Sequence, residues 1–226
     1  MMKIKLIQVI SAFSLLTLSP MCFANSLATE SQKSQLQQFI PKNWEIISQA
    51  NGDLNNDEMK DNVLIIQPKD QRNRKLIILF NQKSQLRSVL TKQIPNWSYS
   101  DAKNCINDAL LSGGLSIQNN VLNIAFEEMN TCSNSYGIIS TYRFQYHRSQ
   151  FKLIGFEYDY LQKNNGEEKI ISGNFQTGKM KTTLQNISLN EIQPIVRWSR
   201  LKALPIHTLD KITLYQSDDF LKQMIQ

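Results

Sequence analysis

Between residues 63 and 187 the apolar residues fall in short segments of strand length, and this spacing constrains the fold more than any other feature of the sequence. Val63 to Ile66 and Leu76 to Phe80 are continuous apolar runs, as is typical of strands buried on both faces. From Leu86 to Thr91 apolar and polar residues alternate, as is typical of a strand with one buried face. The sequence therefore predicts a sheet rather than a helical bundle.

Turn residues join the later segments in neighbouring pairs, which predicts antiparallel pairing. Asn119-Asn120 lies between segments 115–118 and 121–126, and asparagine tolerates the left-handed backbone of a two-residue turn. Turn signals also separate the segments of two further pairs, 139–146 with 151–160 and 170–175 with 181–187. We therefore expect a mainly β (α+β) fold built on an antiparallel β-meander.

Helical periodicity occurs only near the two ends of the chain. Leu36, Phe39 and Ile40 have helical spacing, and Pro41 ends that segment. The segment from Ser217 to Ile225 begins with two aspartates and carries one apolar face. The sequence predicts one short helix at each end of the sheet.

The first 24 residues have the pattern of a secretory signal peptide. Lys3 and Lys5 precede an apolar stretch that ends in Cys22-Phe23-Ala24, with small residues where signal peptidase needs them. We expect cleavage near Ala24, a periplasmic or secreted protein, and one β-rich domain over residues 25–226. A retained anchor and a lipid on Cys22 are the alternatives. No later segment has eighteen consecutive apolar residues, so we do not expect an integral membrane protein.

Cleavage would leave Cys105 and Cys132 as the two remaining cysteines. An even pair in an oxidising compartment predicts a disulfide, and closure of this loop would stabilise the fold by about 3 to 4 kcal/mol. A catalytic cysteine or a zinc site would need further ligands or a base close by, and only His147 and His207 are available.

The charge balance is mildly basic and not concentrated in one stretch. The formal net charge of +6 falls to +4 when Lys3 and Lys5 are removed. Nucleic-acid binding normally needs a dense basic stripe, so we do not expect a nucleic-acid partner. The balance favours anionic envelope polymers or lipid head groups.

The segment from Asp53 to Asp61 has oxygen ligands in an alternating pattern. Asp53, Asn55, Asp57 and Asp61 occupy positions 1, 3, 5 and 9, and the carbonyl of Met59 occupies position 7. This spacing predicts a calcium site, although Leu64 at position 12 excludes an EF-hand. The alternative is an Asn/Asp-rich turn that begins a strand through side-chain to backbone hydrogen bonds, without an ion.

The run Gly52-Asp53-Leu54-Asn55-Asn56-Asp57, followed by Asp61 and an apolar strand, resembles the Asp-Leu-Asn-Gly-Asp-Gly motif of FG-GAP and VCBS repeats. The resemblance implies calcium-ligand roles for the four side chains at positions 1, 3, 5 and 9. It covers only residues 50 to 66, in a single copy, whereas the propellers built from these repeats need several. More of the chain looks like small exported bacterial proteins that carry one such motif, on the segments 39–44, 76–80, 142–146, 153–155 and 177–179.

Candidate catalytic residues are few. Neither His147 nor His207 lies in a nucleophile, zinc or phosphate-loop motif, so we assign no catalytic residue. Glu127 or Glu128 could pair with Glu157 or Asp159 as in a glycosidase, but adjacent glutamates on a strand point to opposite faces. A solvated strand end is the simpler interpretation.

Aromatic residues alternate along two neighbouring predicted strands. Tyr142, Phe144 and Tyr146 lie on one of them, and Phe156, Tyr158 and Tyr160 on the other. Such a stripe is typical of a sheet's inner face, but exposed rings could stack on sugars or fill a partner's groove. Tyr158 and Tyr160 are the members we expect on a binding face if the stripe is exposed.

The absence of catalytic motifs favours a noncatalytic exported binding protein, stabilised by calcium if the loop holds the ion. We expect its partner to be another envelope protein or a glycan. The alternatives are an inhibitor or immunity-type protein against a toxin or hydrolase, and an envelope hydrolase whose site the motifs do not reveal.

Overall fold

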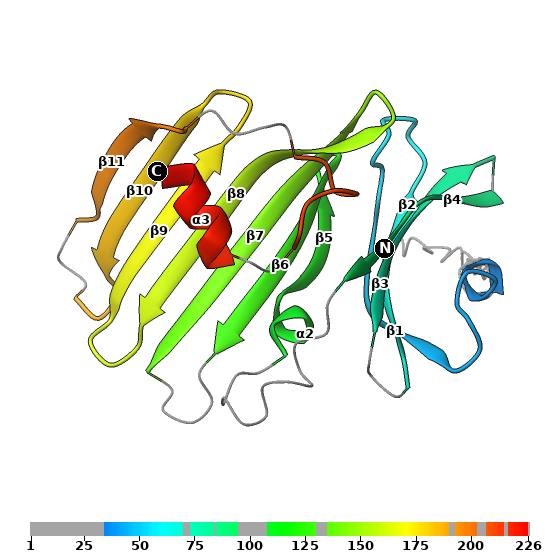
Figure 1. Cartoon of the computed structure of the whole chain (residues 1–226), viewed down its shortest axis with the longest axis horizontal. Helices are drawn as coiled ribbons and strands as arrows, with labels where there is room; N and C mark the ends of the chain where they lie inside the picture. Colours follow the sequence, from blue (N-terminus) through cyan, green and yellow to red (C-terminus); the bar gives the residue numbers. More distant parts are fainter. Residues whose placement is uncertain are drawn as a thin grey trace, which may run out of the picture.

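A computed structural model describes residues 34–69, 73–83, 85–94, 108–129, 135–189, 193–202, 207–214 and 217–225. The chain is mostly β and forms two antiparallel sheets, which confirms the predicted fold class. The small sheet and the large sheet lie side by side, and the chain passes from one to the other between β4 (Gln85–Ile94) and α2 (Ala109–Gly113) (Figure 1).

The small sheet has four strands in sequence order. They are β1 (Trp44–Gly52), β2 (Asp61–Pro68), β3 (Arg74–Gln82) and β4 (Gln85–Ile94). The central strands β2 and β3 carry the two continuous apolar runs, and both are buried almost throughout. Val63, Ile65 and Ile78 belong to the main core, whereas Leu64 and Leu79 belong to a second cluster on the opposite face. Because both faces of β2 and β3 are buried, apolar and polar residues do not alternate along these two strands.

The large sheet is a seven-stranded meander in which every strand pairs with its neighbours in sequence. Its strands are β5 (Gly114–Gln118), β6 (Val121–Met129), β7 (Tyr136–His147), β8 (Gln150–Gln162), β9 (Glu167–Asn174), β10 (Lys179–Asn186) and β11 (Ile195–Arg200). Asn119 and Asn120 join β5 to β6 with φ values of 50° and 62°, and Arg148 and Ser149 join β7 to β8 with 50° and 64°. Two consecutive residues with positive φ suit the right-handed twist of a hairpin, so the predicted turns are confirmed.

Short helices accompany the sheets. One helical turn covers residues 34–37, and Leu36 packs on the outer face of the small sheet. The other two helices are α2 (Ala109–Gly113) and α3 (Ser217–Ile225), and α3 lies across one face of the large sheet (Figure 1). The Phe220 ring of α3 lies 4.9 Å from that of Phe156 and 5.7 Å from that of Tyr142. The two terminal helices agree with the sequence prediction, and α2 is an addition to it.

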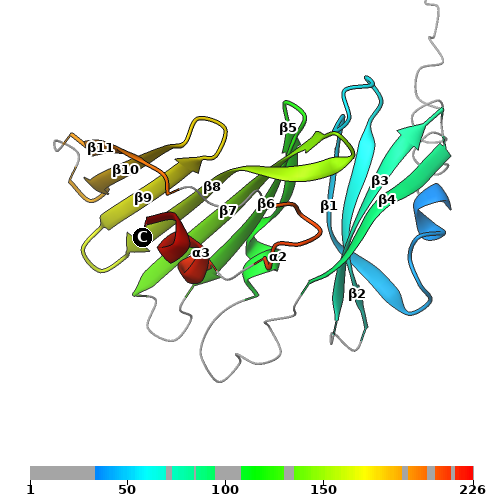
Figure 2. The same cartoon turned by 45° about the horizontal axis from the view of Figure 1, so that its top comes forward.

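One continuous core joins the two sheets. It contains residues from β2 and β3 together with residues of β6, β7, β8 and α3. The four central rings of the aromatic stripe, Tyr142, Phe144, Phe156 and Tyr158, are buried in it. Figure 2 shows the inner face of the large sheet turned toward the small sheet and α3. The interpretation of the stripe as an inner face is confirmed for these four rings.

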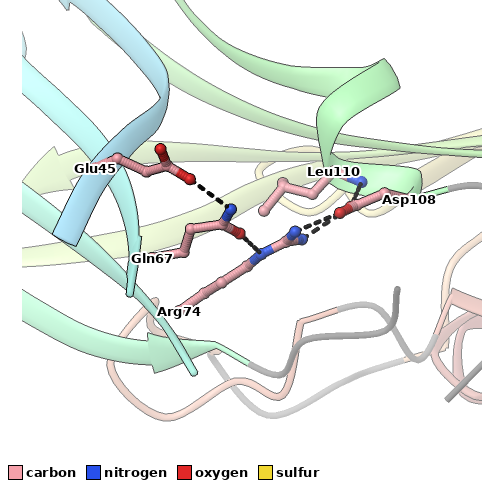
Figure 3. A network of polar contacts seen from close by, with 5 residues as sticks. All are labelled: Glu45, Gln67, Arg74, Asp108 and Leu110. Carbon is pink, nitrogen blue, oxygen red and sulfur yellow. Dashed lines mark hydrogen bonds and ion pairs between the residues drawn. The ribbon is translucent and has the colours of Figure 1, made fainter. Parts of the chain in front are cut away.

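A buried ion pair links the small sheet to the segment that enters the large one (Figure 3). The Arg74 side chain is 1% exposed and forms a two-pronged contact with the Asp108 carboxylate, which is 11% exposed. Arg74 Nε donates to Gln67 Oε1 at 3.1 Å, and the amide of Leu110 donates to Asp108 Oδ1 at 3.3 Å. The pair therefore joins β3 to the first turn of α2.

Loss of one partner from this pair should be costly because the other charge stays buried. We expect Asp108→Ala to lower the free energy of unfolding by about 3 to 5 kcal/mol. The double variant Arg74→Met/Asp108→Ala should recover part of that loss, since an apolar side chain replaces the unpaired cation. Urea denaturation of both single variants and the double variant would measure the coupling. Strictly additive effects would contradict this role for the pair.

Candidate functional site

A groove of about 1310 Å³ lies at one end of the large sheet. The end of β7, the start of β8, the turn between β9 and β10, the end of β11 and His207 line it. Its size is above the upper end of the range usual for small-molecule sites. The sequence analysis did not predict that these segments meet.

The groove forms because β8 changes partners along its length. From Gly155 onward β8 pairs with β9, but before that residue the chain of 207–209 takes the place beside β8. The amide of Leu153 donates to the His207 carbonyl at 2.9 Å, and the amide of Leu209 donates to the Phe151 carbonyl at 2.9 Å. The β9–β10 turn and the 207–209 segment therefore diverge, and the space between them is open.

Four cationic side chains line the groove: Lys152, Lys179, Arg200 and Lys202. Among the described residues that line it, none is acidic. Lys179 and Arg200 lie directly opposite each other on β10 and β11. Like charges in such a cross-strand pair destabilise a sheet, and a bound anion would relieve that repulsion. On the other side of Lys179 lies Asn174, whose Oδ1 accepts the amides of Gln176 and Thr177.

Trp198 adds an exposed aromatic surface to this cationic site. Its side chain is 66% exposed on β11, directly opposite Lys181 on β10. Large apolar side chains at Ile195 and Val196 on the same strand are also exposed. Exposed aromatic and cationic groups together are typical of binding surfaces. In the sequence, the signal for this site is Trp198 between Arg197 and Arg200. No binding site was predicted from it.

The structure brings the two histidines of the chain to the same groove. His147 is the last residue of β7 and is exposed. The His207 ring lies 5.6 Å from the Phe220 ring, and burial lowers the pKa of His207. His207 is therefore neutral at pH 7 and adds no positive charge to the four Lys and Arg side chains.

The acidic residues considered for a glycosidase pair lie elsewhere. Glu157 accepts a hydrogen bond from Ser172 Oγ at 2.6 Å and pairs with Arg143 at 3.2 Å. Glu127 and Asp159 both lie opposite Ile139, on its two neighbouring strands. Glu127 and Asp159 therefore lie on one face of the sheet, two strands and about 10 Å apart, with Ile139 between them. None of these carboxylates lines the groove.

Tyr158 and Tyr160 are placed differently from each other. Tyr158 is 8% exposed, and its hydroxyl donates to Asp218 Oδ1 on α3 at 2.9 Å. Burial is the main cause of the raised pKa of Tyr158. Tyr160 is half-buried, and its ring stacks on Tyr136 with centroids 6.1 Å apart. Tyr158 therefore docks α3 on the sheet instead of lying on an exposed face.

The Asp53–Asp61 segment is a tight loop closed by its own hydrogen bonds. Asp53 accepts the amides of Asn56 and Glu58, at 2.7 and 2.9 Å. Asp57 Oδ1 accepts the amide of Met59, and Asn55 Oδ1 accepts the amide of Asp57. These are the hydrogen bonds that the turn interpretation requires. The donor set, carboxylate and amide oxygens at alternating positions, also fits the chemistry of Ca²⁺.

Asp61 ties this loop to the small sheet. It is fully buried, and its oxygens accept the amides of Leu54 and Asn81 at 2.9 and 3.0 Å. Burial, followed by the nearby Asp57 and Asp53, raises the pKa of Asp61. Within the described part of the chain, no three His, Cys, Asp or Glu side chains form a group that could hold a metal ion.

Two sequence predictions fall outside the described residues. These are the signal peptide of residues 1–24 and the pair Cys105 and Cys132. In the part of the chain that is described, no helix has both the length and the apolar character needed to cross a membrane.

Asp159 makes the stability of the large sheet depend on pH. Burial, followed by Glu168 and Glu157, raises the pKa of Asp159 from 3.8 to about 6. Because the folded-state pKa is the higher one, the favourable contribution is present below about pH 4 and is lost as the pH rises through 6. Asp159→Asn should therefore raise the free energy of unfolding at pH 7.5 by about 1 kcal/mol after solvent screening, and by almost nothing at pH 4.

Urea denaturation at the two pH values would measure this difference. Glu167→Gln is the matched control, since it removes one carboxylate from an exposed site of the same sheet, on β9. An equal effect of Asp159→Asn at both pH values would contradict the assignment.

Comparisons of the chain with protein-family models, with curated proteins and with solved structures find no match.

Proposed function

We propose that the chain is a noncatalytic binding protein that holds an anionic partner in the cationic groove at the end of the large sheet. The observation that carries this proposal is the direct cross-strand pair of Lys179 and Arg200, in a groove whose described lining contains four cations and no carboxylate. Such a site attracts anions and concentrates them near the groove.

The composition of the groove favours binding over hydrolysis. A hydrolase of the kind considered from the sequence needs a carboxylate within reach of the scissile bond or of a histidine. His147 and His207 do line the groove, but the acidic residues of β8, Glu157 and Asp159, do not. The positive charges and the exposed Trp198 are groups that bind a ligand without reacting with it.

The proposal includes export, because the signal-peptide pattern of residues 1–24 would place the groove in the cell envelope or outside it. Anionic partners are common there, both as acidic segments of proteins and as charged glycans. The net charge of +4 after cleavage would support association with either.

Removal of the paired cations should weaken anion binding more than removal of cations elsewhere. We expect Lys179→Gln/Arg200→Gln to lower the affinity for dextran sulfate and for polyglutamate about tenfold or more. The salt dependence of binding should also become shallower, because fewer counterions are exchanged. Isothermal titration calorimetry at two salt concentrations would measure both effects.

Lys60→Gln/Lys222→Gln is the matched control, since it removes two exposed cations outside the groove lining. Equal losses in the two double variants would show that binding follows net charge alone and would contradict the groove as the site.

We also propose that calcium stabilises the loop from Asp53 to Asp61. The side-chain oxygens of Asp53, Asn55 and Asp57 already draw the backbone around them, and a cation would offset the repulsion that the aspartates exert on Asp61. The Met59 carbonyl and Asp61 would complete the ligand set expected from the sequence. Such an ion would be structural. It would lie in the loop between β1 and β2 of the small sheet, apart from the groove.

Calcium at a hundred times its dissociation constant should then raise the free energy of unfolding by about 2.7 kcal/mol. Asp57→Ala should abolish this increment, whereas Glu58→Gln should keep it, since Glu58 is exposed and occupies no ligand position. Thermal melting of metal-free protein, with and without millimolar calcium, would measure it. If calcium leaves the wild-type melting curve unchanged, the turn needs no ion.

A further inference from the structure

Among the residues that the structure describes, strand β11 has one free edge. It is the last strand of the large sheet and pairs only with β10 among the described strands. All six of its residues are exposed. An unpaired edge presents backbone N–H and C=O groups that can pair with another extended chain.

The register of β11 against β10 shows which residues of β11 direct their N–H and C=O groups toward the free edge. The amide of Leu201 donates to the carbonyl of Gly178, which lies directly opposite it, so this is a hydrogen-bonded pair. Hydrogen-bonded and non-hydrogen-bonded pairs alternate along an antiparallel ladder. Val196, Trp198 and Arg200 therefore direct their N–H and C=O groups away from β10, toward the free edge.

The side chains along this edge are basic and apolar. Arg197 and Arg200 lie on β11, and Lys179 and Lys181 lie directly behind Arg200 and Trp198 on β10. A second copy of the chain would bring the same cations against them, and like charges across a strand pair are destabilising. An extended segment with carboxylates would instead pair with them. A glycan carries no regular row of amide donors and acceptors to match the edge.

We propose that the anionic partner of the groove is an acidic polypeptide segment that adds to the large sheet as a further strand beside β11. This inference rests on the proposed anion-binding function of the groove and names its ligand class. The partner's backbone pairs with Val196, Trp198 and Arg200, and carboxylates on the face of Trp198 meet Arg200, Lys179 and Lys181. Backbone hydrogen bonds then provide affinity and the side chains provide selectivity.

The test uses the full chain and an octapeptide, capped at both ends, in which threonine alternates with glutamate. Its lysine counterpart has the same backbone and the opposite charge. A third peptide keeps the glutamates but is N-methylated at every residue, so it has the charge without the N–H donors. We expect the glutamate peptide to bind at least tenfold more tightly than either of the other two.

Val196→Pro tests the edge from the protein side. Proline removes an N–H that points away from β10, and an edge strand tolerates it there. The matched control is Val196→Thr, which keeps the N–H and the β-branched shape. We expect Val196→Pro to lower the affinity for the glutamate peptide at least tenfold, while Val196→Thr stays within about twofold of wild type. If Val196→Pro does not fold, the N-methylated peptide on wild-type protein tests the same backbone hydrogen bonds from the ligand side.

Dextran sulfate separates this inference from the anion-binding function. Its affinity should be the same for wild type and Val196→Pro, because it needs the charges and not the edge. Equal binding of the glutamate peptide and its N-methylated form would overturn strand addition and leave anion binding standing. Failure of both dextran sulfate and the glutamate peptide to bind wild type would overturn the two proposals together.

Discussion

Apolar packing between the inner faces of the two sheets is the interaction on which the rest of the structure depends. Residues such as Ile65 and Ile78 of the small sheet and Phe126 and Phe144 of the large sheet share one buried cluster. Neither sheet could cover these side chains alone, and an exposed apolar face of that size would be unstable in water. The Arg74–Asp108 ion pair also favours one orientation of the two sheets, because two buried charges must meet in one geometry.

Nine of the eleven described strands could be predicted from the sequence because their signals are local, whereas β1 and β11, neither of which has a regularly buried face, were missed. Asn119-Asn120 specifies a tight turn, and the continuous apolar run of β2 indicates burial on both faces before any partner is known. The division into two sheets could not be predicted in the same way. It depends on which faces meet across the core, and the alternation in β6 identifies a buried face without showing which element covers it.

The candidate site was predicted much less well, and the reason is also physical. Lys152 and Lys202 are far apart in the sequence and meet because residues 207–209 replace β9 beside the start of β8. No local pattern encodes that exchange of partners. In β11, by contrast, the sequence does contain a signal, since Trp198 lies between Arg197 and Arg200 in a strand with no buried residue. The loop at Asp53 was found because its oxygen-bearing side chains are close in the sequence.

The pairing of residues 207–209 with β8 also sets the order in which the groove can form. A meander assembles from neighbouring strands, so β5 to β11 can pair while the chain is still being completed. The wall of the groove that carries His207 is added only when the chain beyond β11 returns to Leu153. A chain that is completed in sequence order would therefore acquire its large sheet first and the wall of its groove last.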